Sequence, residues 1–125
     1  MCIRDRINAQ SEIEIWGTGL PMREFLHVDD LADALVHLLK TYSGCTHINI
    51  GTGEEISIHD LAKSIAKTVG FNGKLVFDRS KPDGAMRKLL DASKMKNMDW
   101  APSIHLNEGL ASTYKWYLQN VLEST

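Results

Sequence analysis

The sequence predicts an α/β fold in which a few short strands alternate with about four helices. Residues 12–16, Glu-Ile-Glu-Ile-Trp, alternate polar and apolar side chains as a half-buried strand does. Two later segments repeat apolar residues with the 3.6-residue period of a helix that has one buried face. The strands are too few for a complete doubly wound sheet, so we expect part of a sheet to be missing.

In the first half of the chain, the turn residues 17–21 end the first strand, and residues 22–28 are expected to be an extended connector. Asp29 is the expected cap of the first helix, which the turn Tyr42-Ser-Gly44 ends. The apolar stripe of that helix consists of Val28, Leu31, Ala32, Leu35, Val36 and Leu39. Residues 47–50 are a strand candidate.

In the second half, Ser57 is expected to cap the next helix, with Asp60 completing a near capping box. Gly70 closes that helix, and residues 74–77 form a further strand. A brief strand is expected at residues 89–90. Ser93 is predicted to start a short helix that ends near Asp99, and the final helix begins around residue 106.

Composition excludes several classes of protein. The 125 residues are 43% hydrophobic and 24% charged, with a net charge of −2, which favours neither nucleic acid nor an anionic membrane as a partner. No apolar run approaches the ~18–20 residues that span a bilayer. Cys2 and Cys45 form no CxxC pair, so we expect a reducing cytoplasm. Residues 1–8 are interpreted as a foreign leader or fragment junction, and residues 9–125 as the functional portion.

Some catalytic and cofactor patterns are missing from the sequence. Gly51-Thr-Gly53 lacks the third glycine of a dinucleotide fingerprint, since Ile56 stands in its place, so we interpret it as a turn after a strand. The five histidines never occur at i,i+4, which argues against a metal site. No Gly-x-Ser-x-Gly elbow is present.

Two loops carry chemistry suited to a nucleotide. Residues 81–88, Lys-Pro-Asp-Gly-Ala-Met-Arg-Lys, place three cations and one carboxylate on a loop shaped by proline and glycine. Residues 16–23, Trp-Gly-Thr-Gly-Leu-Pro-Met-Arg, combine an indole with a guanidinium. From the residues alone, a solvated charged loop and a core tryptophan beside a turn remain open alternatives.

Residues 23–32, Arg-Glu-Phe-Leu-His-Val-Asp-Asp-Leu-Ala, resemble a stretch that nucleotide-sugar epimerases and reductases share. A more specific match is the segment 76–91, which contains Lys-Pro-Asp-Gly before Arg-Lys and resembles the signature of GDP-L-fucose synthases. The resemblance extends from about Ser11 to about Asn120. It implies a fragment of a Rossmann-type extended short-chain dehydrogenase, mainly the C-terminal substrate-binding domain.

The resemblance also implies a site and a reaction. The family binds its GDP-linked sugar through residues that align with Trp16, Arg23 and Asp83, with Arg87 and Lys88 nearby. The whole enzyme epimerises and then reduces GDP-4-keto-6-deoxy-D-mannose with NADPH and tends to be a homodimer.

This chain departs from that pattern. It has no cofactor-binding glycine motif and no Tyr-x-x-x-Lys pair, so NADP would bind elsewhere in the parent enzyme, and we expect this chain alone to be inactive. Ala85-Met86 stands where the family usually has a small polar residue and proline, and His105 replaces a usual capping serine. Two alternatives stay open: a fragment of another nucleotide-sugar epimerase or dehydratase, and a non-enzymatic nucleotide-sugar-binding module.

Overall fold

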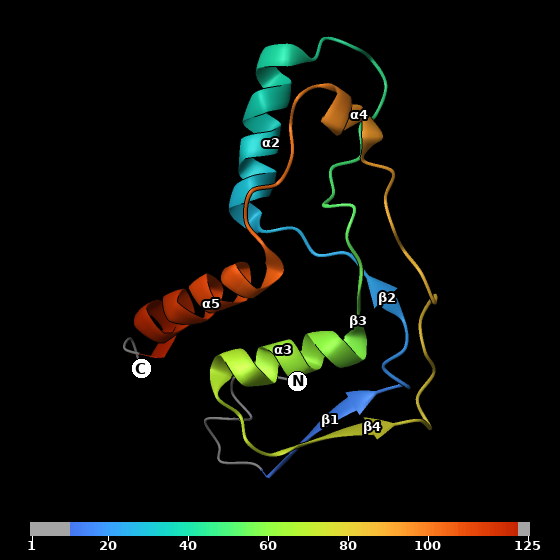
Figure 1. Cartoon of the computed structure of the whole chain (residues 1–125), viewed down its shortest axis with the longest axis vertical. Coiled ribbons are helices and arrows are strands. Elements are labelled where there is room, and N and C mark those ends of the chain that lie inside the picture. Colours follow the sequence, from blue (N-terminus) through green and yellow to red (C-terminus); the bar gives the residue numbers. More distant parts are fainter. Residues whose placement is uncertain (1–10, 123–125) are drawn as a thin grey trace.

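The computed structural model describes residues 11–122, with side chains described to residue 121, so the predicted leader at residues 1–8 lies outside the described part. Its elements are β1 (Glu12–Trp16), β2 (Met22–Arg23), α2 (Val28–Thr41), β3 (Ile56–Ser57), α3 (Ile58–Val69), β4 (Lys74–Asp78), α4 (Ser93–Asn97) and α5 (Leu106–Tyr117). A π-helical turn, Leu118–Leu122, follows α5. The described part thus contains four α-helices and short strands, which confirms the predicted α/β content (Figure 1).

The strands form two separate pairs. β1 and β4 are parallel, with Glu12 opposite Lys74 and Trp16 opposite Asp78. β2 and β3 are antiparallel, and Arg23 faces Ile56. The sequence pattern predicted β1 and β4, but it missed β2 and β3, which are only two residues long and lie in segments without alternation.

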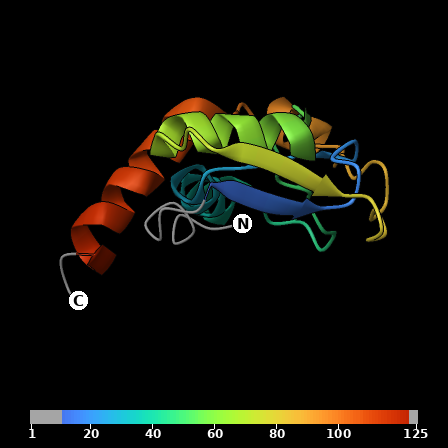
Figure 2. The ribbon, with the colours of Figure 1, turned by 90° about the horizontal axis from the view of Figure 1, so that it is seen from below.

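Helix α3 covers the β1–β4 pair. The alternation in β1 buries Ile13 and Ile15 and exposes the glutamates between them. Figure 2 shows α3 lying across one face of this pair, and its buried residues are Leu61, Ala62 and Val69. This small layer is held together by the burial of aliphatic side chains from both the helix and the strand.

A second core lies between α2 and α4. Ala34, Met95 and Trp100 are its buried members. Leu26, Leu38, Ile48 and Ile50 pack against it. Figure 1 shows α2 and α4 at the far end of the molecule from β1 and β4, so the fold has two hydrophobic clusters rather than one.

The ends of two helices show how well capping was predicted. Ser57 Oγ accepts from the Asp60 backbone N–H at 3.0 Å, which confirms Ser57 as the cap of α3. Asp60 completes the near capping box by accepting from the Ser57 hydroxyl at 2.8 Å, instead of from the Ser57 backbone N–H. Gly70 ends this helix in the left-handed region, with φ of 67°, as predicted. The predicted cap of α2 was wrong. His27, not Asp29, occupies the N-cap, because its Nδ1 accepts from the Asp29 N–H.

Two predicted strands are absent from the described residues. Residues 47–50 form no ladder, because Ile48 and Ile50 pack on the α2–α4 core while no described strand lies alongside. Residues 89–90 are irregular too, and the Leu90 N–H donates to the Glu24 carboxylate at 3.3 Å instead of to a strand. A local apolar pattern cannot supply the pairing partner that a strand requires.

Within residues 11–122, none of the helices has the length and apolar character needed to cross a membrane.

Candidate functional site

The loop of residues 81–88 is fastened along the ends of β1 and β2. Asp83 holds Thr18, two residues after the end of β1, through two hydrogen bonds. The Met22 N–H donates to the Met86 carbonyl at 2.8 Å. In Figure 1 the yellow-to-gold chain accordingly rises from β4 along the same edge of the molecule as β2.

Trp16 is the exposed indole of this edge. It occupies the last position of β1 and is 69% exposed, because the alternation of the strand turns it away from the buried isoleucines. The ammonium of Lys81 lies 5.4 Å from the centroid of the indole ring, within the range of a cation–π contact. The indole N–H donates to the Glu14 carboxylate at 3.0 Å. The alternative of a core tryptophan beside a turn is therefore wrong, and the indole is exposed at the surface.

Asp83 binds the protein in this structure. Its Oδ1 accepts from the Thr18 N–H at 2.8 Å, and its Oδ2 accepts from the Thr18 hydroxyl at 2.6 Å. The hydroxyl first, and then the backbone N–H, lower the pKa of this carboxyl. Gly17 allows the close approach, since its φ is +87° and a side chain there would collide with the Asp83 carboxylate. Asp83 thus fixes the start of the loop.

The predicted cations differ in how they are held. Arg23 donates through Nη1 to the carbonyls of Met22 and Ala85, at 2.6 and 2.7 Å, so this guanidinium supports the middle of the loop. Arg87 donates through Nε to Glu55 at 2.6 Å. Lys88 is exposed and makes no hydrogen bond or ion pair within residues 11–122. Trp16 and Arg23 thus contact the loop that contains Asp83, Arg87 and Lys88. Within the described residues, no hydrogen bond or ion pair joins Lys88 to the other four.

Glu24 is a site-supporting residue that sequence reasoning missed. Its Oε1 accepts from the Gly53 N–H at 2.6 Å and from the Thr52 hydroxyl at 3.3 Å. A carboxylate therefore occupies the position in which a phosphate would bind the Gly51-Thr-Gly53 turn. The turn does not fit the pyrophosphate of a dinucleotide, and no other glycine-rich turn in the chain has the required spacing.

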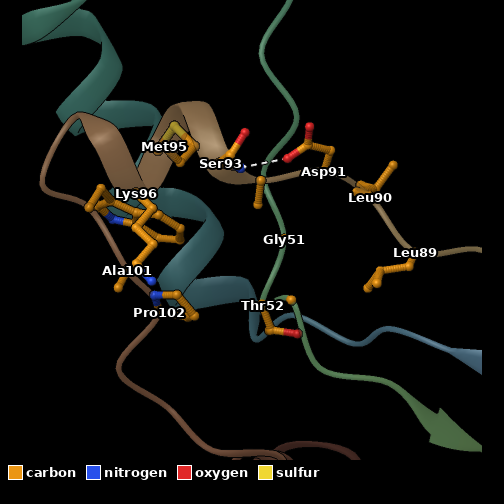
Figure 3. Close-up of a pocket in the computed structure, with 13 residues that line it drawn as sticks. Gly51, Thr52, Leu89, Leu90, Asp91, Ser93, Met95, Lys96, Ala101 and Pro102 are labelled. Atoms are coloured by element: carbon orange, nitrogen blue, oxygen red, sulfur yellow. Dashed lines mark hydrogen bonds between the residues drawn. The ribbon is translucent and has the colours of Figure 1, made fainter.

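A cavity of about 650 Å³ begins where the loop ends. Figure 3 shows its lining, in which Met95 and the segment at Pro102 face residues 51–52 and 89–91 across the opening. The Ser93 N–H donates to the Asp91 carboxylate at 3.0 Å at its rim. None of the five predicted residues lines this cavity, so it is adjacent to the predicted site and separate from it.

A serine, a histidine and an aspartate also meet beside another cavity. Ser112 Oγ lies 3.4 Å from His27 Nε2, and Asp29 Oδ2 lies 3.7 Å from His27 Nδ1. The Asp29 backbone N–H donates to Nδ1, so the neutral imidazole carries its proton on Nε2. Ser112 in turn donates to the Gly109 carbonyl. Nε2 cannot take the serine proton in this tautomer, so the group caps helix α2 and is not a nucleophilic triad.

Comparison with known proteins agrees with the fold. Residues 2–51 match the NAD dependent epimerase/dehydratase family. The GDP-L-fucose synthase 1 of Arabidopsis thaliana is 54% identical over 116 residues, which cover 93% of this chain and 36% of that protein. The chain spans about a third of the length of the curated relatives it matches.

Solved structures give the same result. A GDP-L-fucose synthetase from Naegleria fowleri bound to NADP superposes with a TM-score of 0.87 at 27% identity, covering 94% of this chain and 37% of that one. A GDP-6-OMe-4-keto-L-xylo-heptose reductase from C. jejuni has a TM-score of 0.81 at 38% identity, covering 93% of this chain and 37% of that one. The chain has the fold of part of a Rossmann-type nucleotide-sugar epimerase or reductase. Within that class, nine-tenths of its length is similar in sequence to part of the GDP-L-fucose synthases of two plants, at 54% and 55% identity.

Proposed function

We propose that this chain is the C-terminal, GDP-sugar-binding portion of an NADP-dependent GDP-L-fucose synthase. One observation carries the proposal: the cationic loop is hydrogen-bonded to the ends of β1 and β2 at Asp83, Ala85 and Met86. Because the loop is fixed in this way, its cations and the exposed Trp16 share one edge, as a diphosphate attached to a flat base requires.

Each predicted residue has a role in this proposal. Arg23 and Lys88 neutralise the two phosphates, and Arg87 adds a third cation. Trp16 covers a flat or apolar face of the ligand. Asp83 holds the loop through Thr18 and keeps lone pairs for a ligand hydroxyl or the base.

The whole enzyme would convert GDP-4-keto-6-deoxy-D-mannose to GDP-L-fucose by 3,5-epimerisation and NADPH-dependent 4-reduction. It would act as a homodimer in the cytoplasm, where free cysteines such as the exposed Cys45 persist. The sequence of this chain contains no Tyr-x-x-x-Lys pair for ketone reduction and no glycine-rich turn with the spacing that binds NADP. We therefore expect no NADPH consumption by this chain with the keto sugar, and a steady decay above a protein-free control would contradict the assignment.

Binding calorimetry with the full chain tests the proposal. GDP-L-fucose is expected to bind and UDP-galactose to bind at least about tenfold more weakly, which separates a GDP-sugar site from that of another nucleotide-sugar epimerase. Lys88→Ala should weaken GDP-L-fucose binding by roughly tenfold, the low end for a charge-assisted contact. Lys40→Ala, on the last turn of α2, is the matched control and should leave the affinity unchanged.

Three results would contradict the proposed function. Equal binding of both nucleotide sugars would favour a broader epimerase or dehydratase. No binding of GDP-L-fucose would refute the site. Upstream coding sequence without a glycine-rich turn or Tyr-x-x-x-Lys would favour the second alternative, a non-enzymatic binding module.

A further inference from the structure

Glu55 and Arg87 form an ion pair with unequal partners. The Glu55 side chain is 9% exposed, whereas that of Arg87 is 69% exposed. Arg87 Nε donates to Glu55 Oε2 at 2.6 Å, and Glu55 Oε1 is buried with no hydrogen-bond partner in the described part of the chain. The pair therefore joins a buried acceptor to a solvent-facing cation through a single bond.

This arrangement is a poor one for stability alone. A buried carboxylate with an unused oxygen is costly, and replacing such a pair by apolar residues is often neutral or stabilising. A pair selected for stability would use both carboxylate oxygens in a two-bond fork. Here only Nε is engaged, and within residues 11–122 both terminal nitrogens of Arg87 lack a protein partner. Those two nitrogens form the fork that recognises phosphate oxygens.

The backbone on both sides of the pair is fixed by the same two-stranded ribbon. Glu55 immediately precedes β3, whose first residue, Ile56, is opposite Arg23 of β2. Met86, the neighbour of Arg87, accepts a hydrogen bond from the Met22 N–H of β2. Arg23 and Arg87 are thus held by the β2–β3 ribbon and by the loop that lies along it.

We propose that Glu55 is a positioning residue, which holds Arg87 by Nε so that its terminal nitrogens face the diphosphate of the bound nucleotide. This proposal rests on the proposed function for the identity of the ligand. In this proposal Glu55 strengthens the binding of an anionic ligand, although its own carboxylate is negatively charged. A carboxylate near a phosphate site ordinarily repels the ligand, so its removal should tighten binding if charge alone mattered.

The first test measures the affinity of the full chain for GDP by calorimetry. Arg87→Ala should weaken binding by about tenfold and Glu55→Ala by about three- to tenfold. The double variant should be no weaker than Arg87→Ala, since both changes remove one guanidinium from its place. Glu54→Ala removes an equal charge from the exposed neighbour and should leave GDP binding unchanged or slightly tighter. Guanosine, which lacks the diphosphate, should bind all four variants and the wild type alike.

The second test needs no ligand. In ¹H–¹⁵N spectra, the Nε–H of Arg87 should exchange with water more slowly than that of exposed Arg79, and Glu55→Ala should remove this protection. Equal exchange at Arg79 and Arg87 in the wild type would refute the clamp itself. Tighter GDP binding by Glu55→Ala, or additive losses in the double variant, would refute the positioning role. Failure of the wild type to bind GDP, with Arg87 still protected, would instead refute the nucleotide site and with it the diphosphate as the target of Arg87.

Discussion

Asp30 fastens the segment between α4 and α5 to helix α2, and its conversion to asparagine tests how the two halves of the chain are joined. The side chain is 4% exposed. Its Oδ1 accepts from the Ser103 N–H and hydroxyl, at 3.1 and 3.0 Å, and its Oδ2 accepts from the Ile104 N–H at 3.0 Å. Three donors from one short segment therefore depend on a single carboxylate.

The expected loss follows from the change in donors and acceptors. In Asp30→Asn, the amide oxygen can keep the contacts to Ser103, but the amide nitrogen then faces the Ile104 N–H, which loses its acceptor. Loss of one charge-assisted hydrogen bond with a donor left unpaired lowers the free energy of unfolding by about 2–3 kcal/mol. Asp29→Asn, in the same helical turn but exposed, should cost only about 0.5 kcal/mol through the helix dipole.

The effect should also depend on pH. Burial by itself raises the pKa of the Asp30 carboxyl, but the donors from Ser103 and Ile104, helped by nearby His27, outweigh it and lower the pKa below its usual value of 3.8. The stabilising contribution is thus fully present above the unfolded pKa and is lost as the pH falls through the lower folded pKa.

Urea unfolding followed by tryptophan fluorescence measures the difference, since Trp100 lies in the adjacent core. The gap between wild type and Asp30→Asn should be constant from about pH 7 to 5 and should narrow below about pH 4. A variant within about 0.5 kcal/mol of wild type at pH 7 would refute this account of Asp30, as would a gap that persists unchanged at about pH 2.

Other changes test single features of the fold. Ser57→Ala removes the α3 cap and should lower the free energy of unfolding by about 1 kcal/mol in thermal melts, and an unchanged melting temperature would show that the cap is dispensable. Gly17→Ala should displace the Asp83 carboxylate and weaken GDP binding by at least about threefold, and wild-type affinity would contradict that close approach. Leu39 of α2 is 85% exposed, so Leu39→Glu should leave the free energy of unfolding within about 0.5 kcal/mol of wild type, and a larger loss would contradict that exposure.

The elements with local signals were predictable from the sequence. The period of apolar residues gave helices α2 and α3, and Ser57 and Gly70 marked both ends of α3. The expectation that the apolar stripe of α2 is its buried face was wrong, since Leu35 and Leu39 are 51% and 85% exposed and Ala34 is buried instead. Alternation gave β1. The cap of α2 was misplaced because histidine is an uncommon cap, and only the folded backbone brings its ring nitrogen to the next turn.

The pairing of the strands could not be predicted from local sequence patterns. Nothing in residues 12–16 indicates that they lie beside residues 74–78, and the brief β2–β3 ribbon has no pattern of its own. For the site, the cationic loop and Trp16 carried a chemical signal in the sequence. Thr18, Glu24 and Glu55 did not, because their partners are 28 to 66 residues away along the chain and meet them only after folding.

The parallel pairing of β1 with β4 makes the edge that carries Trp16 and residues 81–88 depend on contacts between distant parts of the chain. The pairing of Glu12 with Lys74 and the contacts of the following loop with Thr18 and Met22 all join segments that are far apart along the chain. Closing so large a segment is slow, and a partly folded chain holds no arrangement of the loop for a ligand to recognise. A ligand that binds this edge only in the folded chain would therefore stabilise the folded state, by about 2.7 kcal/mol at a hundredfold excess over its dissociation constant.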